Sequence, residues 1–124
     1  MLYTVIHLED RSEYREVVER SVMRSQGTYL GLSSLTLLDH VLSQSSAKLF
    51  VVDGSFPRVE GELAELLAPE AIAAIRRYYP TTPILLFSSE NDIEDIAQTC
   101  GVEYMVKTSF TKKRLDDTLR SLLR

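Results

Sequence analysis

The chain has 124 residues, 26% of them charged, and a net charge of −4, which are the size and composition of one soluble globular domain. Its single cysteine excludes an internal disulfide and any zinc site built from several cysteines. The acidic balance argues against direct nucleic-acid binding. The lack of a signal peptide or a long apolar run predicts a cytoplasmic protein that does not contact membranes.

The first half of the chain predicts three strands with a helix between each pair. Residues 2–8 and 49–52 are rich in β-branched and aromatic residues, as are strands buried on both faces. Residues 28–32 contain one glycine and follow another, which is typical of an edge strand. Between the strands, apolar residues recur at helical spacing. The two stripes are Tyr14, Val17, Val18 and Val22, and then Leu35, Leu38 and Leu42, with Ser12 and Ser33 as the expected N-caps.

The second half predicts two more strands and further helices. Residues 62–79 carry apolar side chains at helical spacing, but Pro69 interrupts them. Proline removes a helical hydrogen bond except in the first turn, so this segment predicts two helical pieces or one kinked helix. Strands are expected at residues 84–87 and 102–106. The last two helical stripes are Ile93, Ile96 and Cys100, and then Leu115, Leu119 and Leu122, with Thr111 as N-cap.

The alternation of strands and helices predicts the fold class. A strand–helix unit repeated along the chain implies a parallel sheet with helices on both faces, which is a doubly wound α/β fold. No linker-like segment or internal repeat divides the sequence, so residues 1–124 are interpreted as one domain. Ligands of such sheets bind at the carboxyl ends of the strands.

Polar side chains follow four of the predicted strands. Glu9 and Asp10 follow the first strand, Asp53 the third, Ser88 the fourth and Lys107 the fifth. Each of these residues alone could be a helix cap, a turn residue or a solvated side chain. Those roles do not explain why all of them converge on one edge of the sheet. Clustered carboxylates repel one another and favour a hard divalent cation such as Mg²⁺. One carboxylate could then attack a phosphoryl group, with the lysine and the hydroxyl stabilising the transferred oxygens.

Together these residues resemble the receiver domains of bacterial two-component response regulators, in particular the chemotaxis response regulators, over the whole chain. The matching motifs are the acidic pair in Ile6-His7-Leu8-Glu9-Asp10, Asp53 in Val51-Val52-Asp53-Gly54-Ser55-Phe56-Pro57 with Gly61 after it, Ser88 after Ile84-Leu85-Leu86-Phe87, and Lys107 after Tyr104-Met105-Val106. The resemblance implies a flavodoxin-like fold, with five parallel strands in the order 2-1-3-4-5.

The resemblance also implies a role for each site residue. Asp53 would be the phosphoacceptor, and Lys107 would pair with the phosphoryl oxygens. Mg²⁺ would be held by Asp10 and Asp53 directly, by Glu9 through water, and by the backbone carbonyl of Ser55. The phosphoryl group would come from a histidine kinase or a phosphotransfer protein. The domain would not be an enzyme, although it would promote its own phosphorylation and dephosphorylation.

A switch follows from the same resemblance. Ser88 would bond the phosphoryl group and move toward it, and Tyr104 would then turn inward. The surface that responds would be formed by the fourth helix, the fifth strand and the last helix, roughly residues 91–123. This surface would bind a downstream effector or a dimer partner.

Three features depart from the family pattern. Thr108 follows Lys107 where the family usually has proline, and Phe110 comes one residue later than usual. The segment between Gly61 and Pro83 is also several residues longer than is typical. A degenerate receiver-like module, which binds proteins without phosphotransfer, therefore stays open as the alternative function.

Other phosphate-handling classes fit the sequence less well. A haloacid-dehalogenase-type phosphohydrolase and a toprim-like nuclease both need a second aspartate where Ser55 stands. A flavodoxin-type flavin protein needs a phosphate-binding loop after the first strand. Glu9 and Asp10 occupy that place and would repel a phosphate unless a metal intervened.

Overall fold

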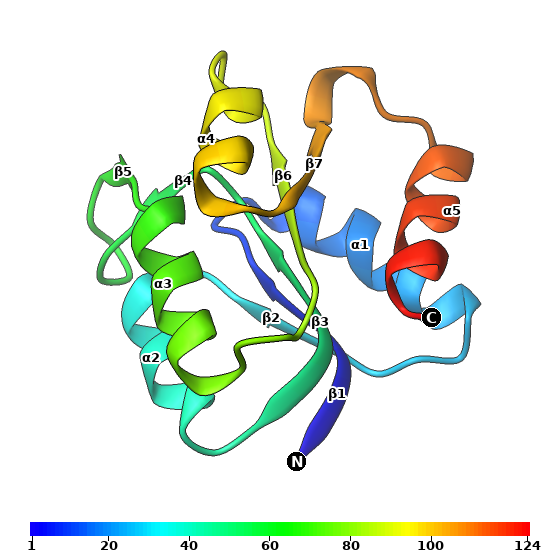
Figure 1. The fold of residues 1–124 in the computed structure, drawn as a ribbon, viewed down its shortest axis with the longest axis horizontal. Helices are drawn as coiled ribbons and strands as arrows, with labels where there is room; N and C mark the ends of the chain where they lie inside the picture. Colours follow the sequence, from blue (N-terminus) through cyan, green and yellow to red (C-terminus); the bar gives the residue numbers. More distant parts are fainter.

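The computed structural model describes residues 1–124, and its secondary structure follows the predicted alternation with one insertion (Figure 1). The main sheet contains β1 (Leu2–Leu8), β2 (Tyr29–Leu32), β3 (Ser46–Val52), β6 (Ile84–Ser88) and β7 (Glu103–Val106). The helices are α1 (Ser12–Arg24), α2 (Leu35–Leu42), α3 (Ala68–Tyr78), α4 (Ile93–Cys100) and α5 (Lys112–Leu122). The insertion is a hairpin of β4 (Ser55–Pro57) and β5 (Ala64–Leu66).

The main sheet confirms the predicted topology. Its five strands lie in the order β2-β1-β3-β6-β7, and every neighbouring pair is parallel. Without the two hairpin strands, this is the order 2-1-3-4-5. Leu8 is paired with Val52, and Val52 with Leu86. The carboxyl ends of the central strands therefore meet at one edge of the sheet.

Helices cover both faces of the sheet, with α1 and α5 on one face and α2, α3 and α4 on the other (Figure 1). Strand residues alternate between the two layers. In β3, Leu49 and Val51 pack in the core beneath α1 and α5, whereas Phe50 and Val52 pack beneath the other three helices. Both faces are apolar, which is why the strands are continuous hydrophobic segments in the sequence.

The prediction of helix before Pro69 is wrong. Residues 64–66 form the outer strand of the β4–β5 hairpin, and α3 begins only at Ala68, with Pro69 in its first turn. Gly61 has φ of +90°, a left-handed conformation that favours glycine in the connecting loop. Leu63 and Leu66 are spaced as in a helix, but both are exposed. Their spacing therefore does not reflect burial against the sheet.

The ends of the helices correct two of the three predicted caps. Thr111 does cap α5, because its hydroxyl accepts a hydrogen bond from the Arg114 amide at 3.1 Å. Ser34, rather than Ser33, caps α2. Ser12 is the first residue of α1 and makes no capping hydrogen bond.

The segment after β7 contains Thr108 and Phe110, the two residues singled out there from the sequence. A short 3-10 helix, η1 (Lys107–Ser109), carries the chain from the buried lysine to Phe110, and no peptide bond of the chain is cis. This turn accommodates the later position of Phe110, whose ring packs edge-to-face on Phe87 at 5.2 Å between centroids.

None of the helices combines the length and the apolar character needed to cross a membrane.

Candidate functional site

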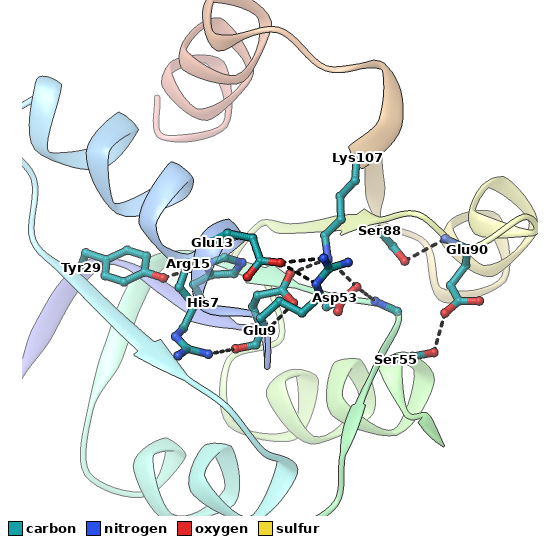
Figure 2. A network of polar contacts seen from close by, with 12 residues as sticks. His7, Glu9, Glu13, Arg15, Tyr29, Asp53, Ser55, Ser88, Glu90 and Lys107 are labelled. Atoms are coloured by element: carbon teal, nitrogen blue, oxygen red, sulfur yellow. Dashed lines mark hydrogen bonds and ion pairs between the residues drawn. The ribbon is translucent and has the colours of Figure 1, made fainter. Parts of the chain in front are cut away.

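The predicted site residues other than Tyr104 converge at the carboxyl edge of the sheet (Figure 2). Glu9 directly follows β1 and Asp53 directly follows β3, so the pairing of Leu8 with Val52 places the two carboxylates side by side. Ser88 ends β6 and is paired with Val106 in β7, which places Lys107 next to it along the edge. Strand register therefore assembles the site from residues that are far apart in the chain.

Three carboxylates form the centre of the site. One oxygen from each of Glu9, Asp10 and Asp53 lies within 4.8 Å of the others. Glu9 is fully buried, Asp53 is buried and Asp10 is half-buried. Backbone amides hold two of these groups, because Arg11 N–H donates to Glu9 Oε2 at 3.1 Å and Gly54 N–H donates to Asp53 Oδ1 at 2.7 Å.

Lys107 supplies the one buried positive charge at the site. Its Nζ lies 2.5 Å from Glu9 Oε1 and 3.1 Å from Asp53 Oδ1 (Figure 2). The ammonium also lies 4.3 Å from the centroid of the Tyr14 ring and 5.9 Å from that of Phe87, so two aromatic faces add cation–π attraction. Three carboxylates against one ammonium leave the cluster with an excess of negative charge.

Because these carboxylates are largely buried, the excess of negative charge is energetically unfavourable. Desolvation, followed by the neighbouring Asp53 charge, raises the pKa of Glu9 to about 8 although Lys107 opposes the shift. Burial also raises the pKa of Asp53, again against the attraction of Lys107. The cluster thus favours uptake of protons or of a cation.

The donor set fits Mg²⁺. This ion prefers a small number of carboxylate oxygens and keeps several waters, and Asp10 and Asp53 offer such oxygens on the solvent side of the buried Glu9. Leu67 N–H donates to Gly54 O in the hairpin. Since antiparallel pairs alternate between bonded and non-bonded positions, the carbonyl of Ser55 points away from β5 and is free to bind a metal.

The apo domain should lose stability as the pH rises from 6.5 to 8. The fold raises the pKa of Glu9 from its ordinary 4.5 to about 8, so the folded protein binds more protons than the unfolded chain in this interval. Its free energy of unfolding falls as those protons leave, by about 2 kcal/mol. Urea unfolding at constant ionic strength and without divalent cations measures the change.

This pH window separates the carboxylates from His7. Burial lowers the pKa of His7 from 6.5 to about 3, so this residue destabilises the fold only as the pH falls below 6.5. Asp53→Asn should stabilise the apo protein at pH 8 and flatten the slope, because it removes a charge beside Glu9. A less stable Asp53→Asn protein, or an unchanged slope, would contradict the charge-repulsion argument.

Ser88 lies opposite Asp53 in a tightly packed corner. Its side chain is buried, and its hydroxyl accepts a hydrogen bond from the Glu90 amide at 3.2 Å. A Cβ on Gly54 would lie only 2.5 Å from Ser88 Oγ and 2.6 Å from Glu90 Cγ. Glycine after Asp53 therefore lets the loop after β6 approach this end of β3 closely.

Sequence reasoning missed several residues that shape the site. Ser55 Oγ donates to Glu90 Oε1 at 2.5 Å, and this contact joins the hairpin to the β6 loop (Figure 2). Arg15 donates from Nη1 to the backbone oxygen of Glu9 at 2.7 Å. The only feature of the sequence that points to Glu90 is its position two residues after Ser88. Tyr14 belongs to the apolar stripe that predicts the first helix, and nothing in its spacing indicates the contact with Lys107.

The predicted switch residue Tyr104 lies apart from the cluster. It is paired with Leu86 in the sheet, and its side chain is 41% exposed. This exposure places the Tyr104 side chain in an outward position.

No family model and no curated protein matches the sequence. Solved structures do match the fold. The chemotaxis protein CheY4 of Vibrio cholerae is 18% identical with a TM-score of 0.77, and the match covers 98% of this chain and 99% of that one. The signal receiver domain of an HD domain-containing protein from Pseudomonas fluorescens is 17% identical with a TM-score of 0.79, over 96% and 92% of the two chains.

A third similar structure, NtrX from Brucella abortus, has a TM-score of 0.80 at 16% identity. The match covers 99% of this chain but only 27% of NtrX. The fold is therefore the doubly wound α/β fold of CheY-like receiver domains.

Proposed function

We propose that this domain is a phosphoacceptor of a two-component phosphorelay, in which Asp53 takes a phosphoryl group from a histidine kinase or phosphotransfer protein. The observation that carries the proposal is the buried Asp53 carboxylate, which lies 3.1 Å from Lys107 and beside two further carboxylates. The receiver fold supports it. A cytoplasmic location, where the donor would be met, belongs to the same proposal.

The contacts of Asp53 suggest how the transfer would proceed. Gly54 N–H and Lys107 both hold Oδ1, which leaves Oδ2 to attack phosphorus. The bond from phosphorus to the donor nitrogen would break as the bond from Oδ2 to phosphorus forms. Mg²⁺ held by Asp10, Asp53 and the Ser55 carbonyl, with Glu9 acting through water, would neutralise the phosphoryl oxygens.

Lys107 and Ser88 would act on the transferred group. The Lys107 ammonium is already within reach of Asp53, so it could pair with a phosphoryl oxygen at little reorganisation cost. The Ser88 hydroxyl could donate a hydrogen bond to another oxygen. These are roles of a domain that promotes its own phosphorylation and dephosphorylation, and no separate substrate is turned over.

Incubation with acetyl phosphate and Mg²⁺, followed by intact-mass measurement, tests the proposal. One phosphoryl group adds about 80 Da, and the addition should disappear when a chelator removes the metal. The alternative is a receiver-like module that binds proteins without phosphotransfer. It predicts no added mass under any of these conditions.

We further expect phosphorylation to move Tyr104 inward and to change the surface of α4, β7 and α5. Ser88 would shift toward the phosphoryl group, and the space behind it could admit the ring. The phosphate mimic beryllofluoride with Mg²⁺ should therefore perturb NMR signals of Tyr104 and of residues 91–100.

Tyr78 provides an internal control, because it is also exposed but lies at the carboxyl end of α3, away from the site. Its ring signals should not move. Shifts confined to residues that contact Asp53 would leave the phosphoacceptor proposal standing and remove the switch. The partner-binding role of this surface depends on the same result.

A further inference from the structure

The β4–β5 hairpin (residues 55–66) presents an open strand edge beside the site. Its inner strand is partly buried, since Phe56 and Pro57 are buried, but all three residues of β5 are exposed. β5 pairs with β4 and with no other strand. The hairpin is therefore a two-stranded sheet with one edge facing solvent (Figure 1).

The pairing register shows which backbone groups this edge offers. Leu67 N–H donates to Gly54 O, and the register continues with Glu65 opposite Phe56. Because hydrogen-bonded and non-bonded pairs alternate, the N–H and C=O groups of Ala64 and Leu66 point away from β4. Such unpaired groups can receive another extended chain.

The side chains along the hairpin are both apolar and acidic. Val59, Leu63 and Leu66 are exposed, and Leu63 reaches 89%, which is the highest value among the large hydrophobic residues of the chain. Residues 59–67 also contain three glutamates and no lysine or arginine. Neither Glu62 nor Glu65 is in an ion pair.

The loop that joins β4 to β5 is held against α2 and α3. Arg58 forms two hydrogen bonds with Glu70 of α3, at 2.8 and 3.1 Å. The carbonyl of Arg58 accepts a hydrogen bond from Thr36 N–H at 3.0 Å, and Ser33 Oγ donates to Glu60 at 2.9 Å. An edge fixed in this way loses little entropy when a partner binds.

We propose that β5 is a docking edge for an extended, basic segment of a partner protein, which adds to the hairpin as a third strand. Backbone hydrogen bonds to Ala64 and Leu66 would set its register, and basic side chains would pair with the glutamates. Apolar side chains of the segment would cover Leu63 and Leu66. A second copy of this chain fits the edge poorly, because it would bring two sets of three glutamates together.

A labelled peptide that alternates arginine and valine tests the proposal, with a glutamate–valine peptide as its counterpart. Fluorescence anisotropy measures affinity, and amide NMR shifts locate the site, both in the unphosphorylated protein. The basic peptide should bind and shift residues 59–67, and the acidic peptide should not. The assay does not depend on phosphotransfer, so it separates this inference from the proposed function.

Matched variants distinguish strand addition from general charge attraction. Glu62→Lys with Glu65→Lys should weaken binding at least tenfold, whereas Glu16→Lys with Glu19→Lys on α1 makes the same charge change on another face and should leave it unaltered. Ala64→Pro should also weaken binding tenfold, because it removes an outward N–H. Slow exchange of the Leu67 amide would show that the hairpin is intact in that variant.

Several outcomes would overturn the proposal. Equal weakening by the two charge reversals would mean non-specific attraction, and shifts outside residues 59–67 would place the peptide elsewhere. A dimer in sedimentation experiments that Leu63→Ser dissociates would show that a second copy occupies the edge. Unchanged binding in Ala64→Pro with an intact hairpin would rule out strand addition.

Discussion

Asp53→Asn is expected to reduce phosphoryl incorporation from acetyl phosphate to background, the largest effect predicted for any substitution in this domain. Asparagine keeps the shape of the side chain and an oxygen for the Gly54 amide and Lys107, which contact Asp53 at 2.7 and 3.1 Å. It lacks a second carboxylate oxygen that could attack phosphorus. Intact-mass spectra of wild type and variant, recorded after the same incubation, make the comparison.

Asp39→Asn is the matched control for that experiment. Asp39 is exposed on α2, so the same chemical change there should leave the added mass of about 80 Da in place. Mass addition that persists in Asp53→Asn would show that another residue is the acceptor. Loss of labelling in both variants would point to a general effect of charge on the reaction.

Asp10→Ala is expected to weaken Mg²⁺ binding by at least tenfold. Asp10 is the least buried of the three clustered carboxylates, whereas Glu9 is already paired with Lys107 at 2.5 Å. Removing Asp10 leaves Asp53 as the only carboxylate that could contact the ion directly, and Mg²⁺ tolerates few changes in its ligands. A magnesium titration followed by amide NMR shifts gives the two affinities.

Ser12→Ala is the control for this titration. Ser12 lies two residues after Asp10 at the start of α1, is exposed and makes no capping hydrogen bond. Its replacement should leave the affinity for Mg²⁺ within about twofold of wild type, since no ligand is lost. Equal affinities of the Asp10→Ala and Ser12→Ala proteins would refute Asp10 as a metal ligand.

Local patterns accounted for the main sheet but not for the hairpin. Strands buried on both faces leave a continuous apolar segment, and helices leave a stripe with a period near four, so both are visible without coordinates. Between Gly61 and Pro69 the same spacing misled the prediction. Leu63 and Leu66 recur as in a helix, yet they are exposed in a loop and an edge strand. Periodicity cannot report which apolar residues are left outside a core.

Chain order likewise predicts one part of the candidate site and does not predict the other. Glu9, Asp53, Ser88 and Lys107 were found because parallel strands bring their carboxyl ends to one edge, so position along the chain predicts proximity. The contacts of Lys107 could not be found in this way. Its pairing with Glu9 and its place against the Tyr14 ring depend on how α1 packs on the sheet.

The alternation of elements, the doubly wound sheet and the residues that line its carboxyl edge are thus predictable without coordinates, because each of these follows from periodicity and chain order. The hairpin after Asp53 and the contact of Ser55 with Glu90 are visible only in the folded protein. The same is true of the need for glycine at position 54, beside Ser88. These features depend on distances between segments remote in the chain, and such distances are set by packing rather than by local preference.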